Sequence, residues 1–199
     1  IWIGVILSFL ADGFVERRFG PITHIFGIPL ISITMFGFAK LTQDIYQIKL
    51  PIKKLLIFSL STWALGTFLY YVFDVGFTIS SFIICLGIVC PGVLAGYKLL
   101  KSPGKKSILD NLFAWALIAE SLHVLDYPFL RYLEGAAIYG FSVGLMMVYI
   151  ISVLIPIVIN RRLSADLNQT LEIKVQERTA QLSEAKEKLV NSAKMSALG

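Results

Sequence analysis

Long apolar segments separated by short polar ones make up most of the chain. The apolar segments cover about residues 1–14, 22–40, 55–73, 77–97, 108–125 and 136–159. A helix needs about 20 predominantly apolar residues to cross a bilayer. The pattern therefore predicts an all-α fold with a bundle of six membrane-spanning helices joined by short turns. The first segment is shorter than a full span, so we expect its helix to begin before Ile1.

Composition supports the membrane assignment. The chain is 56% hydrophobic and only 16% charged, and its mean hydropathy is +0.75, values far from those of soluble domains. The formal net charge of +5 arises largely from basic residues beside the apolar segments, where they act as topology signals. We therefore expect contact with membrane lipids and no binding of nucleic acid.

Lysine and arginine follow the second, fourth and sixth apolar segments and are scarce in the other loops. Short cytoplasmic loops of membrane proteins are enriched in these two residue types. The pattern therefore predicts that both ends of the membrane domain face the cytoplasm. The residues concerned are Lys40, Lys49, Lys53, Lys54, Lys98, Lys101, Lys105, Lys106, Arg161 and Arg162.

From residue 160 onward, charged residues surround aliphatic ones, and from Leu171 the aliphatic positions recur in alternating steps of four and three. This heptad spacing is typical of helices that pack along one seam. Two copies inserted in one orientation send their last helices out in the same direction, so we predict a parallel dimeric coiled coil in the cytoplasm. Arg178 occupies one seam position and weakens the seam. The other seam residues are Leu171, Val175, Leu182, Ala185 and Leu189.

Residues 171–189, LEIKVQERTAQLSEAKEKL, resemble the signalling helix that joins sensor regions to output domains in bacteria. Residues 194–199, KMSALG, resemble the KMAALG stretch that opens the dimerisation helix of histidine kinases. The change from apolar to charged sequence at residue 160, taken with this resemblance, implies three parts: a membrane sensor domain at 1–159, a signalling helix at 160–193, and the start of the dimerisation helix at 194–199.

The family resemblance implies a function as well. The chain is expected to be the input region of a homodimeric two-component sensor histidine kinase in a bacterial inner membrane. ATP and Mg would be used by domains beyond Gly199, where the phosphoacceptor His is also expected, so no catalytic residue is expected within the chain. The phosphoryl group would pass to a cognate response regulator. The alternatives are the same sensor attached to another output, such as a diguanylate cyclase, and a membrane transporter.

The stimulus is unknown, but the predicted topology gathers polar residues at the outer membrane boundary. Ionisable groups in or beside lipid are costly and therefore mark candidate functional sites. Glu120 and His123 are three residues apart, so they share a helix face. Two cofactor hypotheses remain open: one metal ion held by both histidines and a carboxylate, or a haem between the histidines. The alternative is that these residues cap helix ends or contact headgroups. The candidates are Asp12, Glu16, His24, Glu120, His123 and Asp126.

Two further features could serve sensing or assembly. An apolar pocket for a lipid-like signal is a second stimulus hypothesis, although aromatic residues at membrane interfaces also act as anchors. Gly140 and Gly144 form a GxxxG spacing that favours close helix contact, as do Gly92 and Gly96. We assign the first pair to the dimer interface, with packing inside one subunit as the alternative. The aromatic candidates are Trp63, Phe68, Tyr70, Tyr71, Phe113, Trp115 and Tyr139.

Overall fold

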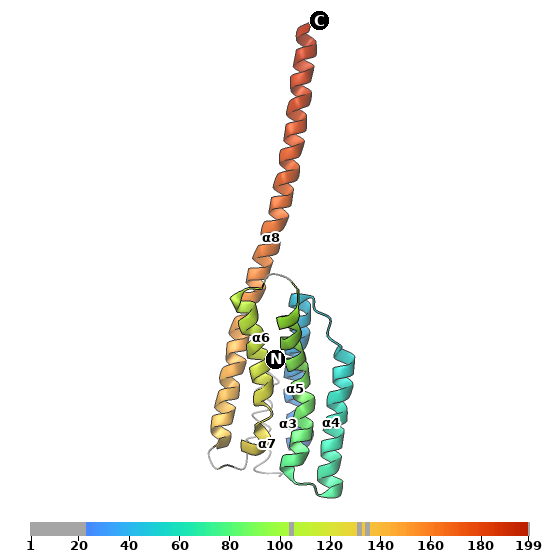
Figure 1. Cartoon of the computed structure of the whole chain (residues 1–199), viewed down its shortest axis with the longest axis vertical. Helices are drawn as coiled ribbons and strands as arrows, with labels where there is room; N and C mark the ends of the chain where they lie inside the picture. The colour runs from blue at the N-terminus through green and yellow to red at the C-terminus, as the bar shows by residue number, and fades with distance from the viewer. Residues whose placement is uncertain (1–22, 104–105, 131–132, 134–135, 199) are drawn as a thin grey trace. The chain divides into compact units, whose positions relative to one another are not determined.

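The computed structural model describes residues 23–103, 106–130, 133 and 136–198. At residues 23–30, 136–138, 141 and 196–198 it describes the backbone alone. Within these described residues every regular element is a helix (Figure 1). The elements are α3 (Thr23–Tyr46), α4 (Ile52–Phe73), α5 (Phe77–Lys101), α6 (Ile108–His123), α7 (Tyr127–Leu130) and α8 (Ala136–Leu198).

Chain contacts divide the molecule into two compact units, residues 1–155 and 156–199. In the first unit α3, α4, α5 and α6 alternate in direction (Figure 1). The ends of α3 and α5 therefore lie at the same end of this unit as the beginnings of α4 and α6. The second unit holds the remainder of α8.

Helix α5 is the centre of the first unit and packs against α3, α4 and α6. In its most apolar stretch of 18 residues, half of the residues are buried, compared with 11% in the corresponding stretch of α4. An apolar helix that is largely buried by other helices lies inside a bundle, whereas α4 turns most of its apolar surface outward. In a membrane that outward surface would face lipid.

Small residues on α5 let its neighbours approach closely. A Cβ atom at Gly96 would lie 2.7 Å from the backbone oxygen of Ala114 on α6, a separation that real Cβ atoms do not reach. A Cβ at Gly92 would overlap the hydroxyl of Ser121, also on α6. Close contact through small residues is the usual packing mode of membrane helices. This pair of glycines therefore serves contact within one chain.

Pro91 lies inside α5 and is buried. Proline has no backbone N–H, so the carbonyl of Gly87, four residues earlier, loses its helical donor. The hydroxyl of Ser59 on α4 donates to that oxygen at 2.5 Å. A neighbouring helix thus satisfies the freed carbonyl, which is how membrane helices tolerate internal proline.

Three helical stretches are long and apolar enough to cross a membrane, among the described residues: Ile52–Phe73, Phe77–Lys101 and a segment within Ser142–Met195. The chain is therefore a membrane protein by length and composition. Two other expected spans, 22–40 and 108–125, are largely helical as α3, which has 24 residues, and as α6. Helix α6 has 16 residues, about 24 Å, which is less than the hydrocarbon core. The expected span at 1–14 lies outside the described residues.

Candidate functional site

The corner between α6 and α7 holds two of the candidate residues, His123 and Asp126. His123 is the last residue of α6, and the backbone N–H of Asp126 donates to its carbonyl at 3.3 Å. This turn brings the two side chains together, with Nδ1 of His123 at 2.8 Å from Oδ2 of Asp126. The imidazole is mostly covered, since its side chain is 17% exposed.

The second ring nitrogen of His123 reaches α8. Its Nε2 lies 2.8 Å from the backbone oxygen of Gly140. A carbonyl oxygen only accepts hydrogen bonds, so Nε2 carries a proton. Nδ1 is then either a donor in an imidazolium–carboxylate pair or an acceptor from a protonated Asp126. In both cases the ring connects the α6–α7 corner to the first turns of α8.

Both ring nitrogens of His123 are thus engaged within the protein. A metal ion or a haem iron binds an imidazole nitrogen that carries no proton. Ligation through Nε2 would therefore require the contact with Gly140 to break, and ligation through Nδ1 would displace Asp126. In the described part of the chain, no three His, Cys, Asp or Glu side chains are grouped as a metal site.

Glu120 lies one turn before His123 and is 6% exposed. Its Oε2 atom is buried and has no hydrogen-bond partner. Leaving a buried polar atom unpaired usually costs about 1–3 kcal/mol. Among the candidate residues of this corner, Glu120 is therefore the one whose burial is least compensated by hydrogen bonds. The sequence signal for it was the Glu-x-x-His spacing, which places both side chains on one face of α6.

Three other candidates, Asp12, Glu16 and His24, have no described side chain, and Asp74, an acidic residue at the end of α4, is not part of this corner. Asp12 and Glu16 lie outside the described residues, and only the backbone of His24 is described, so joint ligation by both histidines stays a hypothesis. Asp74 has a structural role instead: it ends α4 in the left-handed conformation at φ 51°, and its N–H caps the carbonyl of Leu69. Asp is among the few non-glycine residues that adopt this conformation readily.

Gly140 and Gly144 both face groups of their own chain. A Cβ at Gly140 would lie 3.3 Å from Cδ1 of Leu130 on α7, and one at Gly144 would lie 3.4 Å from the His123 ring. A Cβ would therefore be slightly crowded at Gly140 and would make an ordinary contact with the imidazole at Gly144. A dimer contact through the same two glycines stays a prediction.

The seven aromatic candidates do not share one environment. Phe113 is fully buried and stacks on Tyr46, with ring centroids 6.2 Å apart. Four of the others are about half exposed or more, namely Phe68, Tyr71, Trp115 and Tyr139. Exposed aromatic side chains on a membrane protein serve as anchors at the lipid surface. A single pocket lined by these residues stays a hypothesis.

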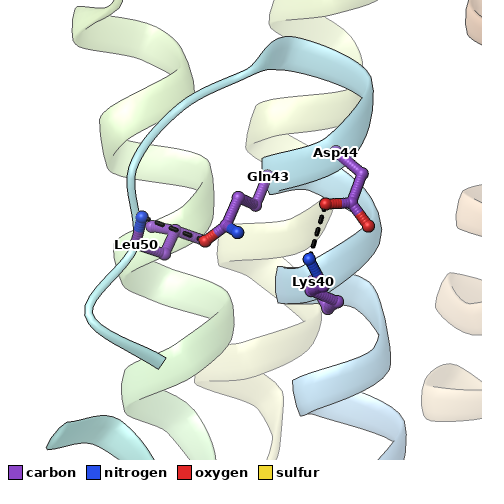
Figure 2. A network of polar contacts seen from close by, with 4 residues as sticks. All are labelled: Lys40, Gln43, Asp44 and Leu50. Atoms are coloured by element: carbon purple, nitrogen blue, oxygen red, sulfur yellow. Dashed lines mark hydrogen bonds and ion pairs between the residues drawn. The ribbon is translucent and has the colours of Figure 1, made fainter. Parts of the chain in front are cut away.

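The opposite end of the first unit carries a polar network that periodicity did not predict. The hydroxyl of Tyr46 donates to Oδ1 of Asp110 at 2.7 Å, which joins α3 to α6. Asp110 also closes a capping box with Ser107 at the start of α6. Figure 2 shows the neighbouring turn, where Oε1 of Gln43 accepts from the N–H of Leu50 at 3.2 Å. These bonds fix the α3–α4 and α5–α6 connections.

In the second unit, the predicted seam residues are exposed on α8. Leu171 is 57% exposed, Val175 60%, and Leu182 and Leu189 are each 71% exposed. Ala185 is exposed as well. Aliphatic side chains repeated at heptad spacing on a charged helix are normally covered by another helix. In this single chain nothing among the described residues covers these five.

Comparison with protein-family models, with curated proteins and with solved structures found no match to this chain.

Proposed function

We propose that the chain is the membrane input region of a homodimeric sensor histidine kinase. The observation that carries the proposal is the exposed seam of α8. An aliphatic stripe at heptad spacing is normally covered by a second helix. The seam leads into residues 194–199, the stretch similar to the opening of a kinase dimerisation helix. A dimeric phosphoacceptor helix placed after such a seam would receive its register from it.

The proposed topology has six spans and both ends in the cytoplasm of a bacterial inner membrane. The alternating directions of α3 to α6 support it, since they place the lysine-rich ends of these helices together (Figure 1). A reporter fused after residue 160 should report a cytoplasmic position. A report from the outer side would mean an odd number of spans and would remove the argument for a cytoplasmic stalk.

Signalling in this proposal is a shift between two arrangements of the membrane helices. A stimulus that binds one arrangement better than the other raises its population by that difference in affinity. The contact of His123 with the backbone of Gly140 is a candidate link, because it joins α6 to the helix that continues into the stalk. The stalk would then alter autophosphorylation with ATP and Mg and transfer to the response regulator.

Crosslinking tests the dimer. The free cysteines Cys85 and Cys90 are first replaced by Ala, and single cysteines are then placed along α8. Seam positions 175, 182 and 189 should crosslink between subunits, whereas the off-seam positions 177 and 184 should not. Uniform crosslinking, or none, would contradict a parallel dimer.

Phosphorylation tests the output. The full gene product should incorporate the γ-phosphate of ATP in an acid-labile form on a His that follows residue 199. Its replacement by Gln should abolish the label. Nucleotide cyclisation without a phosphohistidine would instead favour the alternative, a cyclase joined to the same type of sensor.

A further inference from the structure

One end of the first unit carries a concentration of lysines that lies beside two candidate spans. One lies just before α4 and two lie in its first turn. Two more lie in the last turn of α5, and a sixth precedes α6. Four are exposed, and Lys98 and Lys106 are half-buried. We call these six the lysine cluster. Its members are Lys49, Lys53, Lys54, Lys98, Lys101 and Lys106.

The carboxylates at this end are already engaged. Residues 40–54 and 96–111 contain only two acidic residues, Asp44 and Asp110. Asp44 pairs with Lys40 at 2.7 Å (Figure 2). Asp110 is buried and bonded to Tyr46 and Ser107. No member of the lysine cluster forms an ion pair with a described residue, so nothing in that part of the chain compensates the positive charge of this surface.

Two members of the cluster are held by neutral acceptors. Nζ of Lys98 donates to the backbone oxygen of Lys49 at 2.5 Å, which ties the end of α5 to the α3–α4 connection. Nζ of Lys106 donates to the backbone oxygen of Leu100. An ammonium group has three donors. Each of these two therefore has further N–H groups for an anion.

We infer that the lysine cluster binds the phosphate of anionic phospholipid headgroups. Its place beside the ends of the apolar helices α4 and α5 puts it at headgroup depth when these helices span the bilayer. Basic clusters next to membrane spans attract anionic lipid, with a gain of about fivefold in affinity per lysine. The inference requires membrane insertion but not the kinase output, so either can fail without the other.

The test is a titration of the detergent-purified full chain with phosphatidylglycerol or phosphatidylcholine, read by native mass spectrometry. The wild-type chain should bind phosphatidylglycerol more tightly than phosphatidylcholine. The double variant K53Q/K54Q should lower that affinity about 25-fold and leave phosphatidylcholine binding unchanged. Both lysines are exposed and have no hydrogen bond or ion pair among the described residues, so the fold should survive. Circular dichroism melting checks this.

The matched control is K174Q/K186Q, which removes the same charge from exposed positions of the stalk and should keep wild-type affinity. Adding K98Q to the double variant should weaken binding further. Equal affinity for both lipids, or equal losses in variant and control, would overturn the inference. Soluble glycerol phosphate distinguishes a free anion from a lipid: if it competes at the same concentration as phosphatidylglycerol, the site is not a lipid site.

Discussion

Replacing Ser59 by Ala should destabilise the first unit by removing one hydrogen bond and leaving no substitute. The hydroxyl of Ser59 is the donor to the Gly87 oxygen, whose helical donor is missing because residue 91 is proline. Both Ser59 and Gly87 are buried, so water does not replace the hydroxyl. The substitution changes little volume, and its effect is therefore mainly the loss of this bond.

The expected loss in unfolding free energy is about 1–2 kcal/mol. An unpaired buried acceptor costs about 1–3 kcal/mol, whereas hydrogen bonds between membrane helices average about 0.6 and reach about 1.7 kcal/mol. The upper part of that membrane range applies here, because the freed carbonyl has no second donor. For a chain of this size the change corresponds to a melting temperature lower by about 2–8 °C.

The assay is unfolding by SDS in mixed micelles, followed by circular dichroism. Ser61→Ala is the matched control, since Ser61 lies two residues further along α4 and is exposed; it should change stability by less than about 0.5 kcal/mol. The decisive comparison is made in a Pro91→Ala background. There residue 91 supplies its own N–H to Gly87, so Ser59→Ala should have little further effect.

Two outcomes would refute this reasoning. One is an equal loss for the substitutions at Ser59 and Ser61. The other is a loss from Ser59→Ala that stays the same in the Pro91→Ala background. Either result would mean that the hydroxyl does not compensate for the missing proline donor.

Three other predictions concern α5, the α6–α7 corner and the stalk. Gly96→Ala should destabilise the protein by about 1–3 kcal/mol, because its Cβ meets backbone, while Gly76→Ala, with open space around it, should be close to neutral in the same unfolding assay. His123→Phe should remove the polar contact with Gly140 and change autophosphorylation of the full gene product with little change in helix content; unchanged output would exclude His123 as the link. Arg178→Leu should tighten the stalk dimer by about 1–3 kcal/mol in analytical ultracentrifugation, and equal or weaker association would place residue 178 off the seam.

Hydropathy predicted the positions of the helices well, because the thickness of a bilayer sets the length of the apolar segment that a spanning helix needs. Helix α5 begins at Phe77, as its apolar segment does, and α4 ends at Phe73. The apolar pattern could not show which face of each helix is buried, since lipid-facing and core-facing residues are equally apolar. The pairing of Ser59 with Gly87 depends on that choice of face and was therefore not predicted.

The candidate site was predictable only in part, for a related reason. The spacing of Glu120 and His123 predicted a shared face of α6, and short-range geometry also brought Asp126 to the imidazole. The contact with Gly140 joins residues 17 positions apart through the turn at α7. The spacing of residues along one helix cannot predict a contact between two helices. In the stalk, by contrast, the sequence itself indicates the exposed aliphatic stripe, because aliphatic residues at heptad spacing stand out against a charged background.

Helix α6 is seated on α5 at two glycines. Gly92 and Gly96 lie one helical turn apart, and Ile118 now occupies the notch at Gly96 while Ser121 occupies the one at Gly92. To slide along α5, helix α6 would have to lift both side chains out of these notches at once. The two glycines therefore fix the register of the helix pair, so the two helices are expected to move as one rigid body.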